Sequence, residues 1–94
     1  MNSVSLVGQV VGEPQLRDDW LSIPQCRMRV AVPRRSRDGR REPGVVYVDV
    51  TTFGDEAREC AERLSAGSRV GLSGRLEDDP DEGAGVLIDQ LDFL

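Results

Sequence analysis

Arginine is the residue in this sequence whose type and spacing best suit a binding function. The 94 residues include 12 arginines but no lysine and no histidine. Every basic side chain is therefore a planar guanidinium, which can form forked contacts with phosphate. Five arginines lie within the eight residues RRSRDGRR, Arg34 to Arg41. This segment either binds a phosphate backbone or is a turn whose charges are simply solvated.

The charges of the chain are segregated along the sequence. The chain as a whole is acidic, with 17 Asp and Glu residues and a formal net charge of −5. Residues 27–41, however, hold seven arginines and one aspartate, whereas residues 77–94 hold seven acids and no basic residue. Because a partner that docks at one patch experiences the local charge, an anion can bind the basic segment despite the net charge.

The residues that usually carry catalysis and metal binding are scarce. Histidine, the commonest general base and metal ligand, is absent. Cys26 and Cys60 lie 34 residues apart, outside any short zinc-type spacing. We expect both to be reduced, buried thiols, as free cysteine commonly is. With no phosphate-binding glycine loop and no clustered ligands, the sequence predicts a protein that is not an enzyme, with no cofactor, metal or small-molecule substrate.

Length and hydropathy indicate the number of domains and the cellular compartment. Residues 1–94 are expected to form one small domain, near the lower limit of length for a stable core. No stretch approaches 18 apolar residues, and the start MNSVSLVGQV lacks the basic and long apolar parts of a signal peptide. These features predict a cytoplasmic protein with no membrane contact.

Five segments alternate apolar and polar residues with the two-residue period of a β-strand. They are VSLVGQVVG, CRMRVAV, VVYVDVTTF, SRVGLSGRL and VLIDQLDFL. In SRVGLSGRL, the row expected to face the core is Val70, Leu72 and Leu76. Pro33 should end the second strand, because proline cannot donate to the ladder. The arginine-rich segment that follows is therefore expected to be a hairpin loop with Asp38-Gly39 at its tip. In the last segment, Val86 and Ile88 are out of phase with Leu91 and Phe93, which predicts a bulge near Asp89-Gln90.

Between the third and fourth strands, the period changes to that of a helix. DEARECAERLSAG places Ala57, Cys60, Ala61 and Leu64 on one stripe, with Gly67 as the expected stop. Five strands with one helix between the third and fourth is the element order of the OB-fold, a five-stranded Greek-key barrel. The sequence therefore predicts a small all-β barrel, either the OB-fold or another small barrel with this element order.

The second and third strands each present a polar face. Alternation places the core-facing rows at Met28, Val30 and Val32 and at Val46, Val48 and Val50; the opposite face of the third strand carries Tyr47, Asp49, Thr51 and Phe53. Arg27 and Arg29 also point away from the core. Two interpretations compete for these guanidinium groups, phosphate contact and pairing with Asp49.

Several blocks of sequence, in order along nearly the whole chain, resemble the bacterial single-stranded DNA-binding protein family. They are the opening MNSVSLVGQVVGEPQLR, the second strand MRVAVPRR, and the block VDVTTFGDEARECAERLSAGSRVGLSGRL. The resemblance implies an OB-fold that binds single-stranded DNA without regard to sequence, by base stacking and arginine–phosphate contacts. It also implies a homo-oligomer, a tetramer or a dimer, that serves DNA replication, repair or recombination at the nucleoid.

The resemblance assigns roles to particular residues. Tyr47 lies at a position where the family has a stacking aromatic, and Phe53 is the Phe of its Phe-Gly motif. Either ring has a structural alternative: Tyr47 packs across strands, or Phe53 is tucked beneath the helix. Arg75 of Gly-Arg-Leu is either a phosphate contact or a solvated charge. The candidate nucleic-acid-binding residues are Arg27, Arg29, Arg34, Arg35, Arg37, Arg40, Arg41, Tyr47, Phe53 and Arg75.

The departures from the family pattern concern binding rather than architecture. The arginine loop has Ser36 and no stacking aromatic, and the acidic run EDDPDEG would repel a phosphate backbone unless it is only a soluble turn. Trp20 is expected to fill a barrel end or a subunit contact, and the family's acidic C-terminal tail is expected to be absent. We therefore expect weaker DNA binding than the family's full set of contacts would give. The alternative is an OB-fold module for protein contacts.

Overall fold

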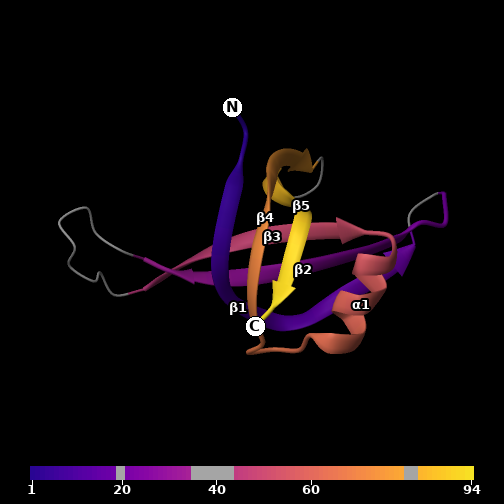
Figure 1. Cartoon of the computed structure of the whole chain (residues 1–94), viewed down its shortest axis with the longest axis horizontal. Coiled ribbons are helices and arrows are strands. Elements are labelled where there is room, and N and C mark those ends of the chain that lie inside the picture. The colour runs from indigo at the N-terminus through magenta and orange to yellow at the C-terminus, as the bar shows by residue number, and fades with distance from the viewer. Residues whose placement is uncertain (19–20, 35–43, 80–82) are drawn as a thin grey trace.

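In the part of the chain that the structure describes, five strands and one helix follow the predicted order (Figure 1). The structure is a computed structural model, which describes residues 1–18, 21–34, 44–79 and 83–94. The elements are β1 (Val4–Asp18), β2 (Pro24–Pro33), β3 (Val45–Phe53), α1 (Asp55–Arg63), β4 (Arg69–Asp79) and β5 (Gly83–Phe93). The predicted all-β fold, with its helix between β3 and β4, is confirmed.

The strands close into a barrel in the order β1-β2-β3-β5-β4, with β4 pairing back to β1. The β3–β5 pair is parallel and the other pairs are antiparallel. One long strand makes this closure possible, because β1 pairs with β4 through its first half and with β2 through its second half. Its register shifts between Val11 and Gln15, where Gly12 adopts a φ of 74°. An irregularity of this kind bends a strand, so β1 can serve both sides of the barrel.

The predicted apolar rows fill the barrel, but two of them continue past its ends. Val30, Val50 and Val70 are buried as expected, whereas Val46 is 49% exposed and Leu76 is 54% exposed. Among the described strands, the first residues of β3 pair only with β2, because β5 meets β3 at Val50 and Thr51. The end of β2 and the start of β3 thus form a two-stranded arm that extends beyond the barrel (Figure 1). Assigning Val46 and Leu76 to the core was therefore wrong, although their parity was right.

Helix α1 lies beside one end of the barrel and buries the predicted stripe. Ala57, Cys60 and Leu64 are buried and Ala61 is partly buried. The expected stop at Gly67 was wrong, because the helix ends at Arg63 and Leu64 is already extended. Gly67, with a φ of 92°, instead serves the turn into β4. Between Arg63 and Gly67 there is no proline or asparagine that would have marked the earlier end.

The predicted bulge in the last strand is confirmed. Along the β4–β5 ladder, Ser73 pairs with Gln90 and Gly74 pairs with Ile88, which leaves Asp89 without an opposing residue. The extra residue shifts the alternation of β5 by one position. This shift explains why Val86 and Ile88 are out of phase with Leu91 and Phe93.

Both cysteines are buried free thiols, as expected. Burial raises the pKa of Cys60 to about 12, with smaller contributions from Cys26, Glu56 and Glu59. Burial likewise raises the pKa of Cys26. Because the thiolate is the reactive form, we expect neither thiol to react with a disulfide reagent in the folded protein at about pH 8. Ellman's reagent should titrate two thiols in denaturant and none beforehand; rapid labelling of the folded protein would contradict this prediction.

Candidate nucleic-acid interface

The outer face of β1, β2 and β3 carries aromatic and arginine side chains in neighbouring rows. In the β2–β3 ladder, Tyr47 lies opposite Ala31, Asp49 opposite Arg29, Thr51 opposite Arg27 and Phe53 opposite Gln25. In the β1–β2 ladder, Val11, Gln15 and Arg17 lie opposite Arg29, Arg27 and Gln25. Directly opposed residues share one side of a sheet. The predicted parity therefore places both aromatic rings and the arginines on one outer face.

The two aromatic rings occupy opposite ends of this outer face. Tyr47 lies on the extended arm and is 59% exposed, whereas Phe53 ends β3 and is 43% exposed. Phe53 is thus open to solvent rather than tucked beneath α1. Six residues separate the rings along one strand, which corresponds to about 20 Å. A ligand that contacts both rings must therefore lie along the strand and pass the arginines between them.

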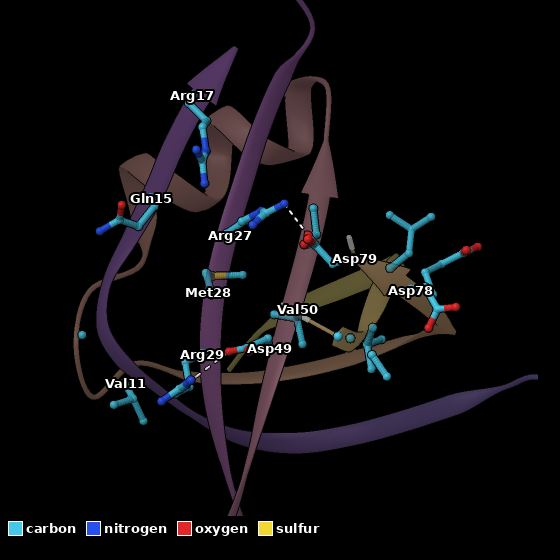
Figure 2. A pocket seen from close by; sticks show the side chains of 18 of the residues that line it. Val11, Gln15, Arg17, Arg27, Met28, Arg29, Asp49, Val50, Asp78 and Asp79 are labelled. Atoms are coloured by element: carbon cyan, nitrogen blue, oxygen red, sulfur yellow. Dashed lines mark hydrogen bonds and ion pairs between the residues drawn. The ribbon is translucent and has the colours of Figure 1, made fainter. Parts of the chain in front are cut away.

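A groove of about 740 Å³ runs between the outer face and the β4–β5 hairpin (Figure 2). Apolar side chains that line it include Met28, Val50 and Val86. Its charged lining comes from β1, β2, β3 and β4. The corresponding region, formed by strands 2–3 and the loops beside them, is where OB-folds bind oligonucleotides. The groove is thus the concave part of the candidate interface.

Both arginines of β2 are paired with acids in this groove (Figure 2). The Nε of Arg29 donates to Oδ1 of Asp49 at 3.1 Å, the pairing considered from the sequence. The Nη2 of Arg27 donates instead to Oδ2 of Asp79 on β4. Sequence reasoning missed Asp79 as a partner because it lies 52 residues away. The acidic run in which it lies was the available signal.

The charged groups that line the groove are acidic in balance. The described lining has five acidic residues, Glu13, Asp49, Glu77, Asp78 and Asp79, and three arginines, Arg17, Arg27 and Arg29. Their formal charge is therefore −2. Arg17 was not among the predicted site residues, although it belongs to the N-terminal block and points outward from β1 in the same row as Gln15. The acidic residues are therefore expected to weaken the positive potential that the arginines of the described groove would offer to a phosphate.

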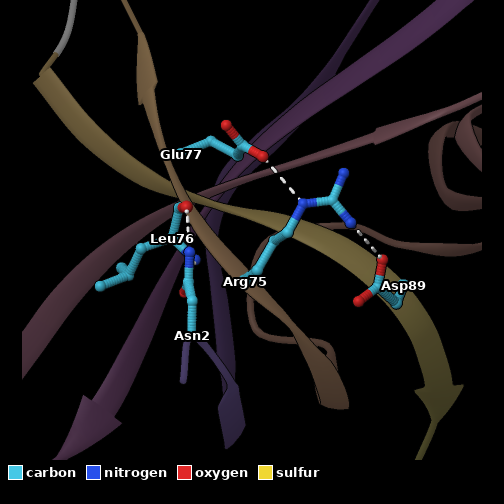
Figure 3. A network of polar contacts seen from close by, with 5 residues as sticks. All are labelled: Asn2, Arg75, Leu76, Glu77 and Asp89. Carbon is cyan, nitrogen blue, oxygen red and sulfur yellow. Dashed lines mark hydrogen bonds and ion pairs between the residues drawn. The ribbon is translucent and has the colours of Figure 1, made fainter.

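Arg75 belongs to a separate network on the outside of β4 (Figure 3). Its Nε donates to Glu77 at 2.8 Å and its Nη1 donates to Asp89 at 3.3 Å. The hydrogen bond to Glu77, with the charge of Asp89, raises the pKa of the Arg75 guanidinium. In the same view, the side-chain amide of Asn2 makes two hydrogen bonds to the backbone of Leu76, at 2.9 and 2.8 Å. Arg75 does not line the groove.

Of the arginine-rich segment Arg34 to Arg41, the structure describes only Arg34. Arg34 is exposed, and its backbone N–H donates to the carbonyl of Gly44 at 3.3 Å, which closes the end of the arm. Arg35, Arg37, Arg40 and Arg41 lie outside the described residues, as do Ser36, the Asp38-Gly39 turn and Trp20. The structure thus brings Arg27, Arg29, Tyr47 and Phe53 onto one face, with Arg34 at the end of the same strand pair.

Metal clusters and membrane-spanning helices are absent from the described residues. No group of three or more His, Cys, Asp or Glu side chains in this part of the chain could hold a metal ion. No helix among the described residues is long and apolar enough to cross a membrane.

Comparison with known proteins identifies the family. The model of the single-strand binding protein family matches residues 1–83. Single-stranded DNA-binding protein 1 of Clostridium acetobutylicum is 31% identical over 78 residues, which cover 82% of this chain and 71% of that protein. The single-stranded DNA-binding protein of Thermosynechococcus vestitus is 29% identical over 103 residues, which cover 100% of this chain and 82% of that protein.

A solved structure supports the same fold. The small single-stranded DNA-binding protein from Streptomyces coelicolor superposes with a TM-score of 0.81 at 22% identity, covering 98% of this chain and 91% of that one. At 22% identity, this structural similarity supports the fold of the chain and nothing further. The family match extends over most of the sequence, and the chain therefore belongs to the single-strand binding protein family.

Proposed function

We propose that this protein binds single-stranded DNA without regard to sequence and without catalysis. The observation that carries the proposal is the outer face itself, where two exposed aromatic rings flank arginines. Stacking on aromatic rings tolerates any base, because every base has a π-face, and guanidinium groups suit phosphates. The residues proposed to contact DNA are Arg27, Arg29, Arg34, Arg35, Arg37, Arg40, Arg41, Tyr47, Phe53 and Arg75.

The proposed contacts differ in how readily they could form. Tyr47 and Phe53 expose their rings, so a base can stack without any rearrangement. Arg27, Arg29 and Arg75 are already paired with carboxylates, which a phosphate would have to displace. The arginine loop would act on the DNA backbone, since it has no aromatic residue to stack a base. We therefore propose moderate affinity with a strong electrostatic part.

Binding should weaken steeply as salt is added. Each phosphate that an arginine neutralises releases counterions, with a slope of log K against log salt of about −0.7 per contact on single strands. Titration of labelled oligo-dT between about 50 and 200 mM salt measures this slope. A slope equivalent to several contacts is expected. Absence of binding at the lowest salt would reject DNA binding as the function.

A second candidate function is supported by the acidic balance of the groove. An OB-fold module whose groove arginines are paired with its own acids could serve protein contacts, with weak or lost DNA binding. The same titration separates the two candidates. Saturable low-salt binding that is similar for oligo-dT and oligo-dA supports the first function, whereas no binding to either favours the second.

Exposed apolar side chains bear on how the protein assembles. Several large apolar side chains are more than 40% exposed; they include Val7, Val11, Leu16, Leu21, Ile23, Val46, Leu76 and Leu94. Such surface supports self-association, and we propose a homo-oligomer, a dimer or a tetramer. Sedimentation equilibrium measures its mass directly. Sequence-independent binding would serve DNA replication, repair or recombination at the nucleoid, in the cytoplasm.

A further inference from the structure

The ion pair between Arg27 and Asp79 joins two strands that are not neighbours in the barrel. β2 pairs with β1 and β3, whereas β4 pairs with β5 and β1. Both residues line the groove, and Arg27 occupies the middle of the outer face, between Gln15 of β1 and Thr51 of β3. The side chain of Arg27 reaches toward the hairpin and meets Asp79 there (Figure 2). The pair therefore spans the groove that a DNA strand would occupy.

A carboxylate and a phosphate can bind the same donors of an arginine side chain. Both present oxygens that accept charge-assisted hydrogen bonds from the guanidinium fork. Oδ2 of Asp79 occupies the Nη2 donor of Arg27. Both side chains are only 24% exposed, so solvent screens this pair less than a fully exposed one. A phosphate that bound Nη2 of Arg27 in the same position would have to displace Asp79.

We propose that Asp79 is a built-in competitor of DNA, a carboxylate that mimics phosphate at Arg27 and thereby limits the affinity of the groove. This inference rests on the proposed function and adds a residue that determines affinity. Binding exchanges one anion for another at the same guanidinium, and the displaced carboxylate moves into solvent.

The backbone at Asp79 is held by strand pairing in addition to the ion pair. The β4–β5 ladder continues through Asp78–Ala84 to Asp79–Gly83, so the strand is held by its own pairing. The carboxylate can therefore leave Arg27 while β4 stays in place. The ion pair between Asp49 and Arg29 can be compared with the one between Asp79 and Arg27. The side chain of Arg29 is 56% exposed and that of Asp49 is 37% exposed. As a more exposed pair, it should restrain binding less.

The test compares neutral variants of adjacent acids in the full chain. Asp79→Asn removes the competitor, and Asp78→Asn is the matched control: Asp78 also lines the groove and carries the same charge, but is exposed with no ion pair among the described residues. With oligo-dT at about 50 mM salt, we expect Asp79→Asn to bind about eightfold more tightly than Asp78→Asn, the counterion-release effect of one added phosphate contact. Asp49→Asn should lie between them.

Two further readouts distinguish competition from a structural effect. The salt slope of Asp79→Asn should steepen by about 0.7, since one more arginine neutralises a phosphate. Adding Arg27→Gln to Asp79→Asn should abolish the gain in both affinity and slope. Thermal melts monitor folding, and Asp79→Ser provides a second neutral variant if the asparagine disturbs the strand.

If wild type binds and the Asp79 variants bind no more tightly than Asp78→Asn, the competitor role is rejected while DNA binding stands. If the Asp79 variants bind and wild type does not, DNA binding is rejected as the function of the wild-type protein, while competition between Asp79 and phosphate at Arg27 is supported. If folded wild type and all folded variants fail to bind at low salt, both the proposed function and the inference are rejected.

Discussion

Replacing Tyr47 with alanine is expected to weaken binding to oligo-dT by about 1–3 kcal/mol, the contribution of one stacked base. The ring is 59% exposed and lies on the arm that β2 and β3 extend beyond the barrel. No carboxylate has to be displaced before a base can stack there, in contrast to the paired arginines. Tyr47, the more exposed of the two rings, should therefore contribute more than any of the paired arginines.

Two controls separate stacking from general effects of truncation. Tyr47→Phe keeps the ring and should bind nearly as tightly as wild type. Val46→Ala truncates the adjacent residue, which is 49% exposed and has the opposite parity on the same strand, and should leave affinity unchanged. Fluorescence anisotropy with labelled oligo-dT measures all three variants. Equal affinities of Tyr47→Ala and Val46→Ala for oligo-dT would show that Tyr47 does not stack a base.

Replacing Gly74 with alanine is expected to reduce the free energy of unfolding by about 3 kcal/mol or more, the upper range for overpacking a dense interior. Gly74 is buried in β4, opposite Ile88 and beside the bulge at Asp89. An added Cβ would lie 2.9 Å from the carbonyl carbon of Leu87, closer still to its oxygen, and 3.1 Å from Cα of Ile88. These are backbone atoms, so relief requires a shift of the strand.

Gly71→Ala is the matched control for this effect. It lies on the same strand, and its added Cβ would meet only side-chain atoms of Leu94 and Val7, at 3.7 and 3.9 Å. These are ordinary contacts, so its stability should change little. Urea unfolding followed by far-UV circular dichroism measures both variants. Equal midpoints for the two would show that the barrel tolerates a methyl group at Gly74, contrary to this prediction.

The fold could be predicted because its signals are local. Alternation assigned the buried rows of Val30, Val50 and Val70, and the phase change in the last strand identified the bulge at Asp89. The same parity placed Tyr47 and Phe53 on the face that carries Arg27 and Arg29. Such patterns repeat every two residues, so each is contained within a few neighbouring positions.

The local signals were insufficient where an element ends. Leu64 has the apolar character of the helical stripe, yet it adopts an extended conformation after Arg63. Val46 and Leu76 have core parity, yet they lie on parts of β3 and β4 that extend beyond the barrel. Parity specifies which way a side chain points. Burial also requires another element on that side, which the local pattern does not reveal.

By itself, the sequence determined the class of barrel, the two sides of each strand and the family to which the chain belongs. Only the tertiary structure decided which acid meets which arginine. Arg29 has its acid directly opposite on the neighbouring strand, whereas Arg27 finds Asp79 across the groove, 52 residues along the chain. That second pairing depends on closure of the barrel, which brings β4 near the outer face. The competition proposed at Arg27 is therefore a property of the closed fold rather than of any one segment.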